Sequence, residues 1–133
     1  MAGMPAKKRN VAVALVGLTM GLLISRYLFT PIEQFRLHSP EGNHTAVVTS
    51  YRLWSLIEML SYPTENKPAR VEIRDSQGRS LGSMPVPRIA MARQLKWIEH
   101  GAHIRLVGTW NFHDGFYAYW NDDQTRMNMH SIN

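Results

Sequence analysis

The sequence predicts an α+β protein: one N-terminal transmembrane helix, then a small antiparallel β-meander domain with one short amphipathic helix. Three observations favour this fold class. Residues 11–25 form a run without charge. Residues 53–60 repeat apolar side chains at the i, i+3, i+4 and i+7 spacing of a helix. Residues 70–75 alternate charged and aliphatic side chains, which is typical of a half-buried strand.

The composition excludes several classes of function. The chain of 133 residues has no cysteine, which excludes disulfides, thiolate zinc sites and cysteine nucleophiles. Its formal charge of +5 lies mostly before Leu37, because ten Lys and Arg residues follow against nine Asp and Glu residues. A nucleic-acid interface needs clustered, unbalanced cations. The near-neutral domain therefore predicts no nucleic-acid partner.

Residues 11–32 are predicted to be a transmembrane signal anchor that follows a cytoplasmic basic tail, residues 1–10. The segment has 22 residues, close to the ~20 that cross a hydrocarbon core. Arg26 interrupts it near its far end, where a long side chain can reach the lipid headgroups. The basic run Lys7–Arg9 precedes it. By the positive-inside rule, this predicts a single-pass protein of the inner (plasma) membrane with an extracytoplasmic, periplasmic C-terminal domain.

Two other interpretations of this segment stay open. A cleaved signal peptide has the same basic and apolar regions, although Leu23–Arg26 is a poor cleavage site and no A-x-A pattern follows it. The second alternative is that this segment is a buried helix of a soluble protein. Gly17 and Gly21 form a G-x-x-x-G motif, a candidate helix contact within the membrane. The motif suggests an alternative role as a structural membrane protein that oligomerises through its helix.

The exported β-rich domain is predicted to span residues 39–120, after a linker at residues 33–38. Ser39–Gly42 has the composition of a turn. The predicted strands and helix of the first half are the strand 45–51, the amphipathic helix 53–60 and a hairpin of strands 70–75 and 79–86. Residues 89–93 fit either a helical turn or a connector.

The second half of the domain is predicted to be two further hairpins. Their strands are 94–98, 103–108, 109–112 and 116–120, with turns at 99–102 and 113–115. Residues 121–133 are polar and are predicted to be a frayed C-terminal tail.

The order of these signals resembles one blade of TolB-type β-propellers over about half of the chain. The matching residues are Ser39, Pro40 and Gly42 before Ala46–Val48, then Val71, Ile73, Asp75, Gly78 and Leu81, then Trp97, Gly101, Ile104 and Leu106. A propeller needs several blades, and the sequence has no second copy. The resemblance therefore implies a strand order and no active site. In layout, the chain also resembles small uncharacterised bacterial envelope proteins.

The histidines are the first candidates for chemistry. His100 and His103 flank a predicted turn, but a zinc site needs three or four converging ligands, so we predict no metal and no cofactor. His113 and Asp114 form a candidate acid–base pair. Asp-Gly is also the sequence of a tight hairpin turn. A small periplasmic hydrolase or ligand-binding domain is thus the alternative to a non-enzymatic protein.

The most suggestive feature is the density of aromatic residues between positions 110 and 120. These candidate protein-binding residues are Trp110, Phe112, Phe116, Tyr117, Tyr119 and Trp120. In an alternating hairpin both faces carry aromatic side chains, so one set fills the core and the other needs a cover. Exposed aromatic residues often anchor protein interfaces. The sequence therefore predicts an accessory subunit or an immunity or inhibitor protein that binds another protein, although a simple core role for all six residues stays open.

Overall fold

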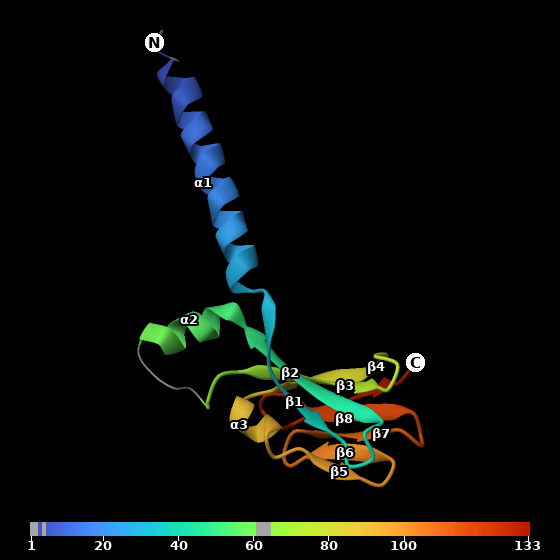
Figure 1. Cartoon of the computed structure of the whole chain (residues 1–133). Helices are drawn as coiled ribbons and strands as arrows, with labels where there is room; N and C mark the ends of the chain where they lie inside the picture. The colour runs from blue at the N-terminus through green and yellow to red at the C-terminus, as the bar shows by residue number, and fades with distance from the viewer. Residues whose placement is uncertain (1–2, 4, 61–64) are drawn as a thin grey trace. The chain divides into compact units, whose positions relative to one another are not determined.

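The computed structural model describes residues 3, 5–60 and 65–133, and it divides into two compact units, Met1–Thr30 and Pro31–Asn133. Three helices lie within these residues: α1 (Ala6–Leu28), α2 (Arg52–Leu60) and α3 (Ile89–Ala92). The chain is therefore of the predicted α+β class (Figure 1). Positions 1, 2 and 4 of the predicted basic tail and residues 61–64 lie outside the described residues.

Two antiparallel sheets account for the strands of the described residues. The first, in the order β1-β2-β3-β4, contains β1 (Pro31–His38), β2 (His44–Tyr51), β3 (Ala69–Asp75) and β4 (Ser80–Val86). The second, in the order β5-β6-β7-β8-β9, contains β5 (Lys96–Ile98), β6 (Gly101–Ile104), β7 (Gly108–Asn111), β8 (Phe116–Trp120) and β9 (Met127–Ser131).

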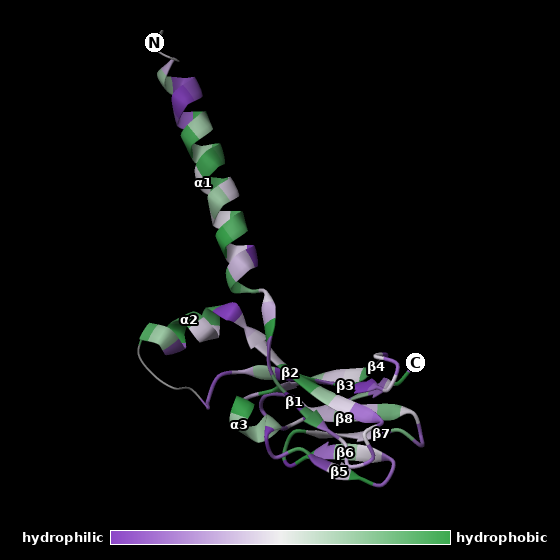
Figure 2. Cartoon of the chain, in the orientation of Figure 1, coloured by the Kyte–Doolittle hydropathy of each residue, from purple (hydrophilic) through white to green (hydrophobic). Residues whose placement is uncertain are grey.

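Helix α1 is long and apolar enough to cross a membrane, as predicted, and none of its residues is buried. Its 23 residues span roughly 34 Å at 1.5 Å per residue. Figure 2 shows hydrophobic residues along its middle turns, between the basic residues at its start and Arg26 near its end. Because nothing buries this helix, the alternative of a soluble core helix loses its support.

The predicted end of the anchor and the predicted linker are both wrong. The helix ends at Leu28, because Pro31 disfavours helical geometry in the residue before it and has no N–H to donate. Residues 31–38 then form β1, which pairs along its length with β2, so that Pro31 lies opposite Tyr51. The compact unit therefore begins at Pro31 instead of residue 39.

The two sheets pack face to face around one apolar core, which makes the domain a two-layer sandwich (Figure 1). The first sheet contributes alternate residues of its strands, including Ala46, Val48, Val71, Ile73 and Met84. The second contributes Ala102, Ile104 and Trp110. Strands β3 and β7 follow the in–out alternation that a sheet with one buried face requires, whereas β2 also buries Val47 on its other face.

Two glycines allow the sheets to approach each other closely. A Cβ atom on Gly82 of β4 would lie 2.3 Å from the ring of Tyr117 in β8, and one on Gly108 of β7 would lie 2.8 Å from the sulfur of Met84. Gly82 also has φ +110°, which side-chain-bearing residues rarely adopt. Its carbonyl oxygen accepts a hydrogen bond from Trp110 Nε1 at 3.3 Å, across the interface between the sheets.

The helices of the domain lie at the edges of this sandwich. Helix α2 follows β2 directly and confirms the amphipathic helix predicted for residues 53–60, although no residue of it is buried. Helix α3 decides the open interpretation of residues 89–93: it is a single helical turn, with Ile89 and Ala92 buried in the core.

The second sheet differs from its prediction in two places. Residues 103–108 are not one strand, because the N–H of Val107 donates to the carbonyl of Ile104 and Leu106 takes a positive φ of 64°, which makes a turn between β6 and β7. The C-terminal tail is not frayed throughout. Residues 127–131 form β9, which pairs with β8 so that Met129 lies opposite Ala118.

Gly82→Ala is expected to lower the free energy of unfolding by about 3 kcal/mol, because the added methyl meets the Tyr117 ring and the backbone is strained. Gly78→Ala is the matched control. Gly78 also has a positive φ, of 78°, but has open space around its Cβ position, so the loss should be only ~1 kcal/mol. Urea unfolding of the full chain in mild detergent measures both losses, and equal losses would contradict the close approach.

The β3–β4 turn is organised by the carboxylate of Asp75. This carboxylate accepts backbone N–H bonds from Arg79 and Gln77, each at 2.9 Å, and a side-chain bond from Arg79 Nε at 2.9 Å. These bonds, the backbone one from Arg79 foremost, hold the pKa of Asp75 below its usual 3.8. The ionised form is thus favoured by folding, and its contribution to stability is complete above the unfolded pKa and is lost as the pH falls through the folded one.

We expect Asp75→Asn to reduce the free energy of unfolding by a constant amount between pH 5 and pH 8, and this difference should shrink below pH 3.8. Arg79→Gln removes the charge and keeps the backbone bond, so most of the pH dependence should remain in that variant. Unfolding curves at several pH values test both expectations. If the stability difference between wild type and Asp75→Asn increased on acidification, ionised Asp75 would not stabilise the fold.

Candidate functional site

The six aromatic residues between positions 110 and 120 do not form one surface. Trp110 is fully buried between the sheets and donates its Nε1–H to Gly82. It is a core residue, which corrects its inclusion among the candidate protein-binding residues. Phe112 lies just beyond β7, partly buried against the core.

Tyr117 and Tyr119 lie on the inner side of β8 with Trp110, because Tyr117 is the register partner of Trp110. Both pack against the core. Their rings stack with that of His130 of β9, at centroid distances of 5.1 and 5.6 Å. These two tyrosines are therefore partly buried and contact both the core and the ring of His130.

The opposite face of the second sheet carries a different apolar group, which we call the outer patch: Phe116, Trp120, Met127 and Met129. Trp120 lies opposite Met127 in the register, and Met129 lies opposite the small residue Ala118. The side chains of Trp120, Met127 and Met129 are 40%, 46% and 65% exposed. Flexible methionines beside an aromatic ring are typical of adaptable protein-binding surfaces.

The outer patch continues to an edge of the sheet. Strand β9 ends the order of the second sheet, and β8 is its neighbour there. Natural edge strands often carry lysine, proline or a bulge that discourages pairing with another chain. Strand β9 reads Met-Asn-Met-His-Ser and has none of these protections. Such an edge can accept an extended segment as an added strand, with the apolar side chains supplying contacts.

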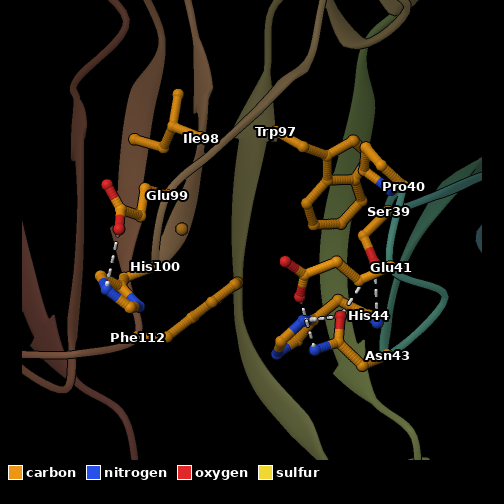
Figure 3. A pocket seen from close by; sticks show the side chains of 11 residues that line it. Ser39, Pro40, Glu41, Asn43, His44, Trp97, Ile98, Glu99, His100 and Phe112 are labelled. Atoms are coloured by element: carbon orange, nitrogen blue, oxygen red, sulfur yellow. Dashed lines mark hydrogen bonds and ion pairs between the residues drawn. The ribbon is translucent and has the colours of Figure 1, made fainter.

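A hollow of about 470 Å³ opens at one end of the sandwich (Figure 3). Its aromatic wall contains Phe112, Trp97 and the ring of His44, which stacks on Phe112 at 4.4 Å. Glu41 and Glu99 lie at its polar rim.

The polar groups of this hollow do not form a nucleophile–base pair. The hydroxyl of Ser39 donates to Oδ1 of Asn43 at 3.0 Å, and Nδ1 of His44 lies 2.9 Å from the same oxygen. Ser39 also accepts the backbone N–H of His44. A catalytic serine needs its hydroxyl on the base itself. These bonds instead hold the turn between β1 and β2.

The other histidines do not converge either. The ring of His103 lies 2.9 Å from the hydroxyl of Thr109, whereas His100 lies beside His113, with ring centroids 5.5 Å apart. In the part of the chain that the structure describes, no three His, Asp or Glu residues are grouped to hold a metal ion. The carboxylate of Asp114 accepts a bond from Asn111 at 2.9 Å, which closes the β7–β8 turn.

A second hollow, of about 580 Å³, lies between β1, α2 and α3. At its wall the ammonium group of Lys67, only 5% exposed, donates to Gln34 at 2.9 Å and to Glu58 at 3.0 Å. Arg93 covers the ring of Phe35 at 4.5 Å from its centroid. Because the buried ammonium group of Lys67 has hydrogen-bond partners, we interpret it as a group that stabilises the fold.

Gly17 and Gly21 lie on one side of α1, four residues apart. A Cβ atom at either position would meet nothing within 4 Å. Their role as a helix contact stays a prediction.

Comparison with protein-family models, with curated proteins and with solved structures finds no match for this chain. The resemblance to a propeller blade accordingly stays a prediction.

The sequence prediction missed the two methionines of the outer patch. The signal that points to them is the alternation in residues 127–131, where Met127 and Met129 share one parity and His130 has the other.

Glu58→Ala is expected to lower the free energy of unfolding by about 2 kcal/mol, because it leaves the buried ammonium of Lys67 without its carboxylate. Lys67→Met should cost less, since the partly exposed Glu58 can regain water. Chemical unfolding of the full chain in detergent compares the two variants. A larger loss for Lys67→Met would show that the aliphatic stem of the lysine, instead of the ion pair, stabilises this site.

Proposed function

We propose that this chain is a non-enzymatic membrane-anchored protein whose exported domain binds another protein. In this proposal α1 is the anchor, and the outer patch with the free edge of β9 is the binding surface. The observation that carries the proposal is the exposure of Trp120, Met127 and Met129 on one face beside an unprotected edge strand.

The anchor is supported by the length and apolar character of α1 and by the three basic residues in its first turns. The positive-inside rule then favours a cytoplasmic N-terminus and a domain on the extracytoplasmic side of the inner membrane. Arg26 in the last turn suits the opposite interface, where its cation lies near the negative end of the helix dipole.

The choice of a protein as partner rests on the chemistry of the surface. The outer patch is apolar and carries two methionines and an indole, and the neighbouring strand edge presents backbone groups. A partner with an extended apolar segment satisfies both at once by adding a strand beside β9. The hydrogen bonds of Ser39 at the first hollow and of Asp114 in the β7–β8 turn hold turns, so they lend no support to the alternative of a hydrolase.

Met129→Ser together with Met127→Ser is expected to weaken partner binding at least about tenfold, because two anchoring side chains are lost. The fold should be unchanged, since both side chains are exposed. Ile98→Ser is the matched control, because Ile98 is half-exposed on the same face at the opposite edge of the sheet.

A photo-crosslinking residue at position 129 in the full chain, in its native membrane, identifies the partner, and binding to the purified partner is then measured with each variant. Equal binding by wild type and the double variant would overturn the proposal. Cross-links only between copies of this chain would do so as well, and would favour the alternative of a structural membrane protein that oligomerises.

A further inference from the structure

The second half of helix α2 exposes apolar side chains. Along the helix Leu53, Leu56, Ile57 and Leu60 share one side. Leu53 and Ile57 are half-buried, whereas Leu56 is 36% exposed. Met59 and Leu60 are 83% and 86% exposed. An amphipathic helix of a soluble domain normally packs its whole apolar side on the core, whereas the described residues leave the end of this side exposed.

Polar residues of α2 contact the rest of the domain. Glu58 pairs with the buried ammonium of Lys67 at 3.0 Å, and Ser55 lines the same hollow, with the largely exposed Met59 at its margin. Glu58 and Ser55 therefore face the protein, and the exposed side chains of Leu56, Met59 and Leu60 are left for a different environment.

The chain itself keeps α2 near the end of α1. Only Phe29 and Thr30 separate Leu28, the last residue of α1, from Pro31. Three residue steps span at most about 11 Å. Pro31 is the register partner of Tyr51, and α2 begins at the next residue. Paired Cα atoms lie roughly 5 Å apart. The start of α2 thus lies within roughly 20 Å of the end of α1, whatever the angle between the two units.

We propose that α2 lies on the membrane surface and places Leu56, Met59 and Leu60 among the lipid headgroups and upper acyl chains. This inference rests on the proposed anchoring by α1. An interfacial helix of this kind has a polar side, an apolar side and contact with the boundary of the bilayer. Tyr51, half-exposed at the start of the helix, suits the same interface. The lipid surface is the apolar environment that the short connection brings within reach.

The absence of cysteine allows a direct test, because each single-cysteine variant of the full chain carries one probe. Variants Met59→Cys, Val16→Cys and Gln77→Cys are labelled with a polarity-sensitive fluorophore. They are reconstituted in vesicles of phosphatidylcholine and phosphatidylglycerol that contain a lipid-borne quencher. Val16 reports the anchor. Gln77 is the control, since its exposed turn is at the opposite end of β3 from the residues that pair near Tyr51.

The expected result is strong quenching at position 16 and quenching at position 59 that exceeds that at position 77 by roughly twofold or more. Strong quenching at position 16 with equal quenching at positions 59 and 77 would overturn the placement of α2 and leave the anchor intact. Without quenching at position 16, the anchor fails, and the placement of α2 fails with it. Met59 is exposed, so circular dichroism of its variant should match the wild type.

Discussion

Burial of Trp110 between the two sheets is the interaction on which the domain depends. Its indole fills the interface and its N–H reaches the carbonyl of Gly82 on the facing sheet. This approach is possible because residue 82 has no side chain, which also leaves room for Tyr117. Each sheet alone would leave an apolar face in water, so the pairing of the layers stabilises both. The packing of Trp110 also determines which face of the second sheet points outward.

Local periodicity was sufficient to predict a good part of the fold. The uncharged run at residues 11–25, the helical spacing of residues 53–60 and the alternation at residues 70–75 are each continuous local patterns. Such patterns indicate helix or strand without knowledge of distant contacts. The α+β class follows from them directly.

The remainder depends on contacts between distant residues. Strand β1 was hidden because Pro31 and Ile32 continue the apolar run of the anchor, and only pairing with β2 makes them part of a sheet. The sequence of β9 is typical of a polar tail, and it forms a strand because it pairs with β8. The sequence shows the aromatic cluster. The alternation of side chains along a strand does not reveal which face of the strand packs on the other sheet. For this reason Trp110 is included among the candidate protein-binding residues, and Met127 and Met129 are missed.

The connection of two residues between helix and domain also limits where encounters take place. A domain on a long flexible linker samples a large volume, whereas Phe29 and Thr30 keep Pro31 within about 11 Å of the last residue of α1. Held at a bilayer, such a domain would meet other membrane-bound molecules by diffusion in two dimensions and at a high effective concentration. A ligand that is free in solution would have no such increase in effective concentration. If α1 is the proposed anchor and the domain binds a protein, this short connector would favour binding to neighbours in the same membrane over binding to molecules from the surrounding solution.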